Sequence, residues 1–327
     1  MKPRRLRFFV ALNTGYVTDG KPDKRFVEFY RRRSSPRLYC AIVGNVVIPG
    51  GYGTNDSTPT ISSAPEWKDV ASAIAERGSL PGIQLTTTWK GYAGLRSFRS
   101  LTPHIAVEQS REVVRGLHQA DIKSVLQGLD DASGLAVDAG FKHLQVHAAH
   151  GYLFNLLVDD RFNKHAFEVR ELLAKWAAKY SAAGAETSIR ASMRTGDQGL
   201  DANGAEHIYA MIASLRFDFV DLSSGFYNID KRLIYPGRPD VLEDRRAESV
   251  ALALRLPRQD LIMSGRALLK SDEDLPTNLH IGLCRDLIAN PDYLTDNSRG
   301  CENYGKCHYF SRGANHLICQ QWNASPL

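Results

Sequence analysis

The sequence predicts an α/β protein that folds as a single (β/α)8 barrel, the TIM barrel. Eight short runs rich in Val, Ile, Leu and Phe alternate with longer segments of helical periodicity. Continuous apolar runs are typical of parallel strands that are buried on both faces. Strict alternation of strand and helix indicates βαβ units. Eight such units favour a closed barrel over an open doubly wound sheet, and a chain of 327 residues suits that fold.

The first strand is expected at Leu6–Leu12, because the apolar run after the basic start is too short for a signal peptide and Asn13 ends it without a cleavage site. The other strands are expected at Leu38–Gly44, Gly82–Thr86, His143–Ala149, Thr187–Ser192, Phe217–Ser223, Asp260–Gly265 and Leu279–Arg285. The helices between them are expected at Asp23–Arg33, Pro65–Arg77, Ala106–Ala139 with an interruption, Ala166–Ala182, Ala205–Ser214 and Ala247–Arg255. No linker is long enough to separate domains, so residues 1–327 are expected to form one domain with a cysteine-containing tail at 296–327.

Composition indicates a globular protein with a sizeable core. A hydrophobic content of 43% suits a sizeable core, and no apolar run is long enough to span a bilayer. The net charge of +5 is mild, and Arg31, Arg32 and Arg33 fit the solvated end of a helix better than a nucleic-acid site. Five cysteines, an odd number, argue against a disulfide framework. We expect a cytoplasmic protein that binds neither membrane nor nucleic acid, and a homo-oligomer stays open.

The most informative motif, from His147 to Leu153, has the sequence His-Ala-Ala-His-Gly-Tyr-Leu and follows the fourth apolar run. One strand end and its turn can aim several polar groups into a single cavity. Histidines can donate hydrogen bonds to a substrate oxygen, and a tyrosine can deliver a proton. Two isolated histidines are more often satisfied surface groups, so the motif gains its meaning from the other strand ends.

The C-terminal ends of all strands of a barrel meet on one face, which carries the active site. Two glycine-containing loops, at residues 50–55 and 91–94, follow the second and third strands and are candidate ligand loops. The residues expected at these strand ends are Leu12, Asn13, Gly44, Gln84, His147, His150, Tyr152, Arg190, Ser264, Gly265, Cys284 and Arg285.

The last two strand ends form a candidate phosphate site. Backbone N–H groups can approach a ligand closely at Gly265, and the Arg285 guanidinium can hold oxygens in bidentate fashion. Gln84 and Arg190, deeper in the mouth, suit a planar heterocycle that carries carbonyls and a ring N–H. Together these residues describe a flat, phosphorylated cofactor with a polar edge, and FMN fits that description.

These residues resemble the old yellow enzyme family of flavin-dependent oxidoreductases, over the chain from Leu6 to about Cys319. The His147–Leu153 motif resembles the branch with two histidines, where other members have histidine and asparagine. Asn13-Thr14-Gly15 and the cysteine-bearing tail are more similar to the dienoyl-CoA reductase and trimethylamine dehydrogenase branch.

The resemblance implies a cofactor role for ten residues. Leu12 and Gly44 would contact the flavin through backbone atoms, and Asn13 would lie near flavin N5. His147 would also lie against the cofactor, and Gln84 and Arg190 would bind the pyrimidine edge of the ring. The phosphate would be held by Ser264, Gly265, Cys284 and Arg285.

The resemblance also implies the reaction. NADH or NADPH would reduce the flavin, and an α,β-unsaturated carbonyl compound would then accept hydride from flavin N5 on its β-carbon. His147 and His150 would bind the substrate carbonyl, and Tyr152 would protonate the α-carbon. Donors placed where enolate charge develops stabilise the transition state more than the ground state.

The chain departs from the family in ways that predict a shortened, more open mouth. The family has a long segment after the fourth strand, whereas here Asn163-Lys164-His165 leads directly into a helix. The third strand ends Gln84-Leu85-Thr86-Thr87 where the family usually has Gln-Leu-x-His. Asn13 replaces a cysteine or threonine near flavin N5, and Cys284 replaces a glycine.

The tail cysteines Cys301, Cys307 and Cys319 resemble a cluster-binding run whose second cysteine would fall near Tyr304. A 4Fe–4S cluster takes four thiolates, so three favour a degenerate remnant that binds no metal. His308 as a substitute ligand, and a Cys-His zinc site, stay open on spacing alone.

The resemblance therefore predicts an FMN-dependent ene-reductase, and two alternatives stay open. A specialised pathway flavoenzyme would instead perform a dehydrogenation, an isomerisation or an amine oxidation, which agrees with the shortened loops and with Asn13. A degenerate barrel would act as a binding protein with little turnover.

Overall fold

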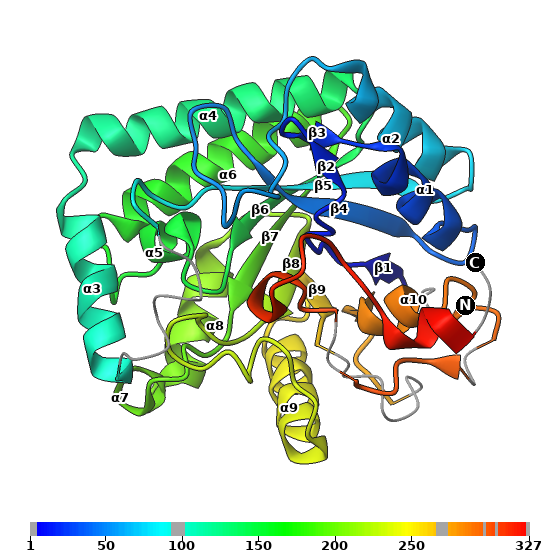
Figure 1. The fold of residues 1–327 in the computed structure, drawn as a ribbon. Coiled ribbons are helices and arrows are strands. Elements are labelled where there is room, and N and C mark those ends of the chain that lie inside the picture. The colour runs from blue at the N-terminus through cyan, green and yellow to red at the C-terminus, as the bar shows by residue number, and fades with distance from the viewer. Residues whose placement is uncertain (1–4, 93–101, 266–273, 297–298, 305–306, 325–327) are drawn as a thin grey trace.

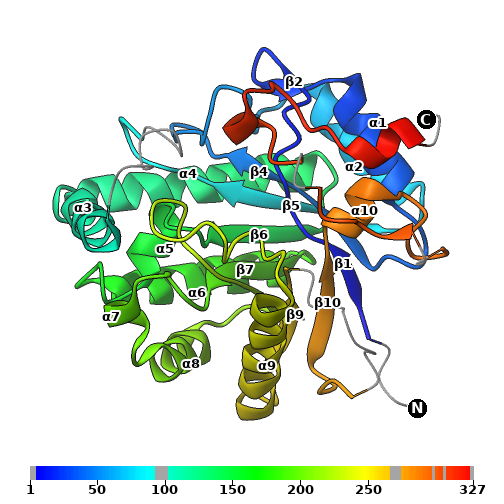
Figure 2. The same cartoon turned by 60° about the horizontal axis from the view of Figure 1, so that its bottom comes forward.

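The computed structural model describes residues 5–92, 102–265, 274–296, 299–304 and 307–324. Eight parallel strands close into a barrel in the order β1–β10–β9–β8–β7–β6–β5–β4 (Figures 1 and 2). They are β1 (Arg7–Phe9), β4 (Cys40–Val47), β5 (Leu80–Thr86), β6 (His143–Ala148), β7 (Glu186–Ser192), β8 (Phe219–Ser223), β9 (Asp260–Met263) and β10 (Leu279–Leu283). The predicted TIM barrel is confirmed, and a two-stranded hairpin, β2 (Val17–Thr18) with β3 (Lys21–Pro22), follows β1.

The helices cover the outside of the barrel (Figure 1). The described ones are α1 (Lys24–Arg33), α2 (Pro65–Ala75), α3 (Pro103–Arg115), α4 (Gln119–Asp138), α5 (Leu153–Val158), α6 (Ala166–Ala182), α7 (Gln198–Asp201), α8 (Gly204–Ser214), α9 (Pro239–Arg255) and α10 (Arg285–Ala289). Two short 3-10 helices, η2 (Phe310–Arg312) and η3 (Gln320–Ala324), lie in the tail.

Most of the predicted helix boundaries agree with the structure, and one differs for a local reason. The expected interruption within Ala106–Ala139 falls between α3 and α4. The predicted start of the α9 helix at Ala247 is wrong, because the helix begins at Pro239 with Asp240 in its first turn. Proline suits the first helical position, where its missing N–H has no partner to lose, and an acidic side chain there complements the helix dipole.

Helix α1 begins and ends at clear signals, but its basic end is only partly solvated. The Asp23 carboxylate caps the helix by accepting hydrogen bonds from the backbone N–H groups of Arg25 and Phe26. Arg33, expected on a solvated face, is buried and donates to the carbonyl oxygens of Leu287 (2.8 Å) and Ile288 (3.0 Å). The buried guanidinium therefore joins α1 to α10.

The tail packs back onto the barrel. The backbone N–H of Leu317 donates to the carbonyl of Thr14 (2.7 Å), and the Tyr16 hydroxyl donates to the carbonyl of Leu317. The indole N–H of Trp322 donates to the carbonyl of Ile288 (2.8 Å). In Figure 1 this segment, drawn in red, passes in front of the strands and returns beside α10. The tail thus forms part of the wall around the barrel mouth.

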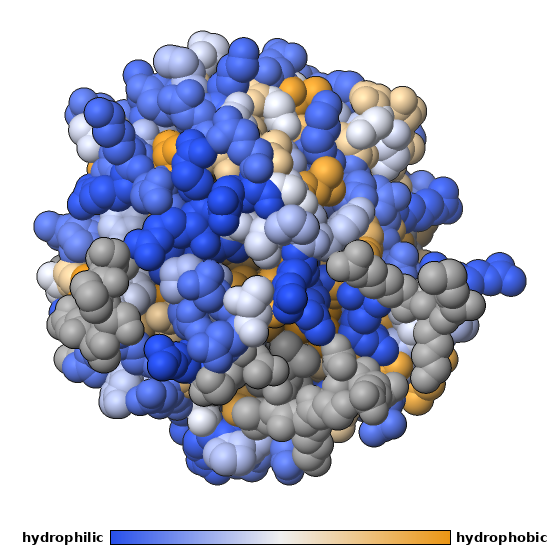
Figure 3. Space-filling view, turned by 90° about the vertical axis from the view of Figure 1, so that its right-hand side faces the viewer, coloured by the Kyte–Doolittle hydropathy of each residue, from blue (hydrophilic) through white to orange (hydrophobic). Residues whose placement is uncertain are grey.

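The face that carries α10 is mostly hydrophilic, with hydrophobic side chains in separate small areas (Figure 3). None of the helices in the described part of the chain combines the length and hydropathy needed to cross a membrane.

An apolar cluster fills the barrel at the N-terminal ends of its strands. Phe8 has no exposed surface, and its ring meets the rings of Tyr39 and Phe219 edge-on at centroid distances of 5.3 Å. Val10, Ile42 and further apolar residues complete the cluster. Because this layer closes the barrel below the active-site end, its packing supports the strand ends above it.

We expect Phe8→Ala to lower the free energy of unfolding by about 3–5 kcal/mol, since it leaves a cavity among side chains that cannot collapse onto it. Phe167→Ala removes the same ring from a position on α6 that is 63% exposed, and it should change stability little. Urea unfolding of both variants measures the difference. Equal losses in the two variants would show that the Phe8 cluster does not stabilise the barrel.

Candidate active site

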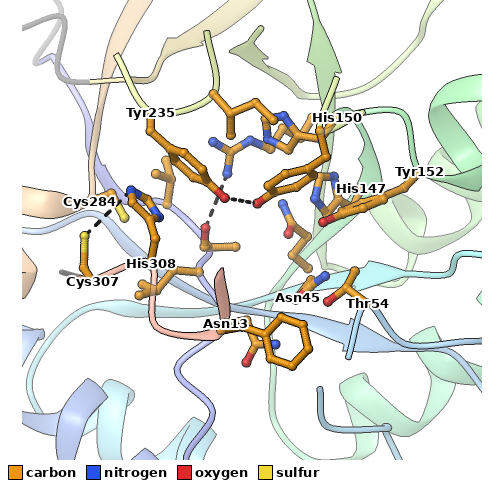
Figure 4. Close-up of a pocket in the computed structure, with 18 of the residues that line it drawn as sticks. Asn13, Asn45, Thr54, His147, His150, Tyr152, Tyr235, Cys284, Cys307 and His308 are labelled. Atoms are coloured by element: carbon orange, nitrogen blue, oxygen red, sulfur yellow. Dashed lines mark hydrogen bonds between the residues drawn. The ribbon is translucent and has the colours of Figure 1, made fainter. Parts of the chain in front are cut away.

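A cavity opens among the C-terminal ends of the barrel strands, with about 1280 Å³ of empty space when its open mouth is counted (Figure 4). Ten of the twelve residues predicted at the site line it: Leu12, Asn13, Gln84, His147, His150, Tyr152, Arg190, Gly265, Cys284 and Arg285. The loops predicted as ligand loops contribute Thr54, Asn55 and Tyr92, whereas residues 93–94 lie outside the described residues. Barrel geometry therefore brings the predicted residues together.

Gly44 and Ser264 are the two predicted residues that do not line the cavity. Gly44 bridges to Leu12, and a Cβ there would lie 2.9 Å from the Cβ of Gln84. Glycine at this position lets the β4 backbone pack closely against Gln84. The Ser264 hydroxyl donates to the carboxylate of Asp221 (2.5 Å), so only the backbone of Ser264 is available to a ligand.

A buried carboxylate, Asp221 on β8, organises the floor of the cavity. Its Oδ2 lies 3.6 Å from Nε of Arg190 and accepts a hydrogen bond from the Gln145 side chain (3.5 Å). Gln145 in turn accepts from the amide nitrogen of Gln84 (2.6 Å). The strand register places these residues opposite one another, Gln84 against Gln145 and Arg190 against Asp221. The result is a polar layer inside the barrel.

This layer holds Arg190 and Gln84 in place, the two side chains expected to bind the polar edge of a cofactor. Arg190 also donates to the carbonyl of Ala11 (3.4 Å), yet its buried Nε lacks a hydrogen bond within normal distance. Gln84 uses its amide nitrogen toward Gln145, which leaves its carbonyl oxygen as an acceptor for a ligand N–H. A donor and an acceptor held side by side suit the edge of a heterocycle that carries C=O and N–H groups.

His147 is the histidine that is poised to bind a ligand. Its ring is 4% exposed, and its Nδ1 is buried without a hydrogen-bond partner among the described residues. Burial, with smaller contributions from His150 and Arg190, holds the pKa of His147 well below its usual value. The imidazole is therefore neutral at pH 7 and carries one N–H donor.

His150 is already engaged by the protein. Its Nδ1 lies 3.2 Å from the carbonyl oxygen of Gly225, and its Nε2 lies 3.3 Å from the Ser223 hydroxyl. Because a carbonyl can only accept, Nδ1 carries the proton and Nε2 accepts from the hydroxyl. Burial, followed by the charge of Arg190, also lowers the pKa of His150 well below its usual value. His150 packs edge-on against His147 at a centroid distance of 5.3 Å.

Tyr152 lies directly beside His147, with ring centroids 5.0 Å apart. It is 5% exposed, and burial, together with the neighbouring phenols of Tyr227 and Tyr92, raises its pKa well above the usual value. The phenol is therefore protonated at neutral pH. A neutral imidazole and a protonated phenol side by side can hold an oxygen and deliver a proton to an adjacent atom.

The opposite end of the cavity carries positive charge at the ends of β9 and β10. The Arg285 guanidinium donates to Asn303 Oδ1 (2.9 Å) and to the carbonyl of Pro236. Arg245 on α9, which sequence reasoning missed, lies so close that a Cβ on Gly265 would be 2.9 Å from its Nη1. Burial lowers the pKa of Arg245 to about 10, so it stays charged at pH 7. Residues 266–273, which follow Gly265, lie outside the described residues.

Asn13 and Cys284 line the cavity as predicted, with their polar groups already constrained. The Asn13 side chain donates to the Thr58 hydroxyl (3.1 Å) and accepts from the backbone N–H of Gly15 (2.9 Å). Burial raises the pKa of the Cys284 thiol to about 12. Cys284 is therefore a neutral thiol near Arg285.

The tail cysteines lie around one small cavity together with Tyr304. Burial raises the pKa of Cys307 to about 11. Three thiols and a phenol provide one sulfur fewer than the four that a 4Fe–4S cluster takes, so the residues do not fit that group. Among the described residues, the group of potential metal ligands that lie within 4.8 Å of one another is Asp159, Asp160 and His207.

Several cavity residues were missed because they lie in segments without periodicity. Tyr227 and Tyr235 come from the loop after β8, and Tyr309 comes from the tail, beside His308, which the sequence suggested only as a metal ligand. The sequence signal that could have found the first pair is the position of their loop, since every loop after a barrel strand borders the mouth.

The model of the NADH:flavin oxidoreductase / NADH oxidase family matches residues 5–168 of the chain. Enoate reductase 1 of Kluyveromyces lactis is 25% identical over 333 residues, which cover 89% of this chain and 81% of that protein. NADPH dehydrogenase of Clostridium acetobutylicum is 25% identical over 249 residues, 69% of each chain. The solved structure of 2-naphthoyl-CoA reductase with 2-naphthoyl-CoA has a TM-score of 0.67 at 17% identity. The match covers 90% of this chain and 50% of that chain. That likeness supports the fold.

We expect the free energy of unfolding to fall as the pH is lowered from 7 to 5. The pKa of His147 is depressed in the folded state, so the unfolded chain binds more protons below about pH 6.5 and acid favours unfolding. His147→Asn should reduce this slope by up to about 1.4 kcal/mol per pH unit. His104→Asn, at an exposed position of α3, is the matched control. Urea unfolding at several pH values gives the slopes, and identical slopes for wild type and His147→Asn would contradict the buried, neutral state of His147.

Proposed function

Since the chain belongs to the NADH:flavin oxidoreductase / NADH oxidase family, whose model covers residues 5–168, we propose that it is an FMN-dependent reductase of α,β-unsaturated carbonyl compounds that uses NADH or NADPH. The observation that carries the proposal is the pair formed by His147 and Tyr152. A buried imidazole with an unpartnered nitrogen lies against a buried, protonated phenol in one cavity. This pair has the two donors that reduction of a conjugated carbonyl needs.

The residues of the cavity fit FMN. The Arg190 guanidinium, which lines the cavity while its Nε faces Asp221, and the carbonyl oxygen of Gln84 would hold the polar edge of its ring. Arg285, with the close approach that Gly265 allows, would hold its phosphate, and the buried charge of Arg245 behind Gly265 would add to the positive potential there. When bound, FMN supplies the hydride that the reaction requires. The rest of the chemistry falls to the side chains of this protein.

His147 binds and polarises the substrate carbonyl in this proposal. As a neutral imidazole it donates one hydrogen bond to the carbonyl oxygen, and that bond strengthens as negative charge grows on the oxygen. Arg190 adds positive charge nearby, as its effect on the pKa of His147 shows. His150 becomes a second donor only after its ring is released from Ser223 and Gly225. Its first role is to hold His147 in place.

Tyr152 supplies the proton for the α-carbon. Its phenol keeps the proton at neutral pH because burial disfavours the phenolate. Its ring is packed between His147 and Tyr227, so the hydroxyl is held within the cavity. Proton delivery by a positioned side chain typically accelerates a reaction by about 10²–10⁴-fold.

The charge of the cavity argues against the alternative of amine oxidation. The described residues that line it include two arginines, Arg190 and Arg285, and no carboxylate. Such a cavity disfavours a protonated amine and favours a neutral substrate that acquires negative charge during reduction.

We expect Tyr152→Phe to slow oxidation of the reduced protein by cyclohexenone by about 10²–10⁴-fold, because this step needs the phenolic proton. Reduction by NAD(P)H should change little, since it takes no proton from Tyr152. Stopped-flow absorbance measures both steps separately. Tyr209→Phe makes the same chemical change on α8, outside the cavity, and should affect neither.

Two results would contradict the proposal. If Tyr152→Phe slowed both steps equally, or neither, the tyrosine would not be the acid. If the wild-type protein carried FMN and accepted electrons from NAD(P)H but did not reduce enones, the substrate class would be wrong.

A further inference from the structure

Three phenols lie in sequence from the interior of the cavity toward its rim. The ring of Tyr152 stacks on that of Tyr227, with centroids 5.6 Å apart and planes inclined by 25°. Tyr235 donates a hydrogen bond from its hydroxyl to the hydroxyl of Tyr227 (Figure 4). Tyr152 is 5% exposed, whereas Tyr227 and Tyr235 are partly exposed. The three side chains thus form a continuous row from a nearly buried tyrosine to two partly exposed ones.

The loop after β8 that carries Tyr227 and Tyr235 is held in place by contacts with its neighbours. The backbone N–H of Tyr227 donates to the carbonyl of His150 (3.2 Å), and that of Phe226 donates to the carbonyl of Thr195 (2.9 Å). The Phe226 ring lies so close to Gly151 that a Cβ there would be 2.8 Å from it. The loop is therefore docked onto the turn that carries Tyr152.

Because Tyr152 is buried, it requires a route by which its hydroxyl regains a proton. A general acid that gives its proton to carbon must regain one before the next turnover. Water reaches an almost fully buried hydroxyl poorly, and the neighbours that the structure gives to the Tyr152 ring are themselves aromatic: His147, His150, Tyr92 and Tyr227. A phenol is both a donor and an acceptor, so it can pass a proton on.

We propose that Tyr235 and Tyr227 form a proton relay that returns a proton to Tyr152 after each turnover. This inference rests on the proposed function, in which Tyr152 protonates the substrate. When the O–H bond of Tyr152 breaks and a C–H bond forms, the Tyr227 proton moves to the Tyr152 oxygen. The Tyr235 proton then moves to the Tyr227 oxygen, and Tyr235 takes a proton from water or a buffer acid at the rim.

The hydroxyls of the chain are suited to this exchange. Burial raises the pKa of Tyr227 and raises that of Tyr235 well above its usual value, so both are protonated at neutral pH. The neighbouring phenol of Tyr227 also contributes to the raised pKa of Tyr152. Like groups exchange a proton without a large change in free energy.

The test compares a single turnover with continuous turnover. In Tyr227→Phe and in Tyr235→Phe, the first oxidation of the reduced holoprotein by cyclohexenone should proceed at nearly the wild-type rate, because Tyr152 begins protonated. Continuous turnover should fall by roughly 10²-fold, as expected when a positioned proton transfer is lost, and added imidazole buffer should restore part of it. Loss of the first turnover as well, or of neither, would overturn the relay.

Tyr92 provides the matched comparison, because it also meets Tyr152 edge-on, at 5.9 Å between centroids. If Tyr92→Phe slowed continuous turnover but not the first turnover, and Tyr227→Phe did not have this effect, the proton would come through Tyr92. The proposed path would then be wrong.

A second measurement needs no turnover. In protein that carries ¹³C at the tyrosine ζ-carbon and no cofactor, Tyr227→Phe should move the Tyr152 resonance, and Tyr235→Phe should move that of Tyr227. Unmoved resonances would overturn the relay whatever reaction the protein performs. A wild-type protein that shows these shifts but reduces no enone would instead overturn the proposed function and, with it, the catalytic use of the chain of phenols.

Discussion

A single buried carboxylate, Asp221, is the constraint on which the cavity depends. A carboxylate without exposed surface is costly unless charge and hydrogen bonds compensate it. Arg190, Gln145 and Ser264 supply that compensation from the neighbouring strands, and Gln84 extends the layer through Gln145. Because Asp221 holds Arg190 against the inside of the barrel, the guanidinium is presented to the cavity in a fixed place. The polar layer thereby links β5, β6, β7 and β8 with the residue that follows β9.

The cavity has a polar floor, formed by this layer, and aromatic side chains above the floor. The floor consists of strand residues whose positions the barrel register sets, which suits the binding of a rigid, planar group. The end of β6 adds His147, the turn after it adds Tyr152, and the loop after β8 adds Tyr227 and Tyr235. These two segments are joined by the hydrogen bond between Tyr227 and His150. In the proposed function, substrate binding and proton supply would therefore depend on these two joined segments.

The sequence was sufficient to predict the strands and the residues at their C-terminal ends. Apolar runs identified the strands, and barrel geometry then brought residues as distant as Asn13 and Arg285 to one mouth. Asp221 was missed because it lies within an apolar run, and its importance arises from the strand register with Arg190. Tyr227 and Tyr235 were missed because a loop has no periodicity from which side-chain positions follow. The engagement of both ring nitrogens of His150 likewise depends on Gly225 and Ser223, far along the chain.

The central claim is that Arg190, held by Asp221, binds the polar edge of FMN. Titration of the cofactor-free protein with FMN, followed by quenching of flavin fluorescence, measures this most directly. We predict one FMN per chain and an affinity about 10- to 100-fold weaker in Arg190→Gln, the loss expected for a charge-assisted hydrogen bond. Thermal melting shows whether that variant stays folded with Asp221 unpaired. A wild-type chain that binds no FMN, or a folded Arg190→Gln variant that binds it with undiminished affinity, would contradict the account.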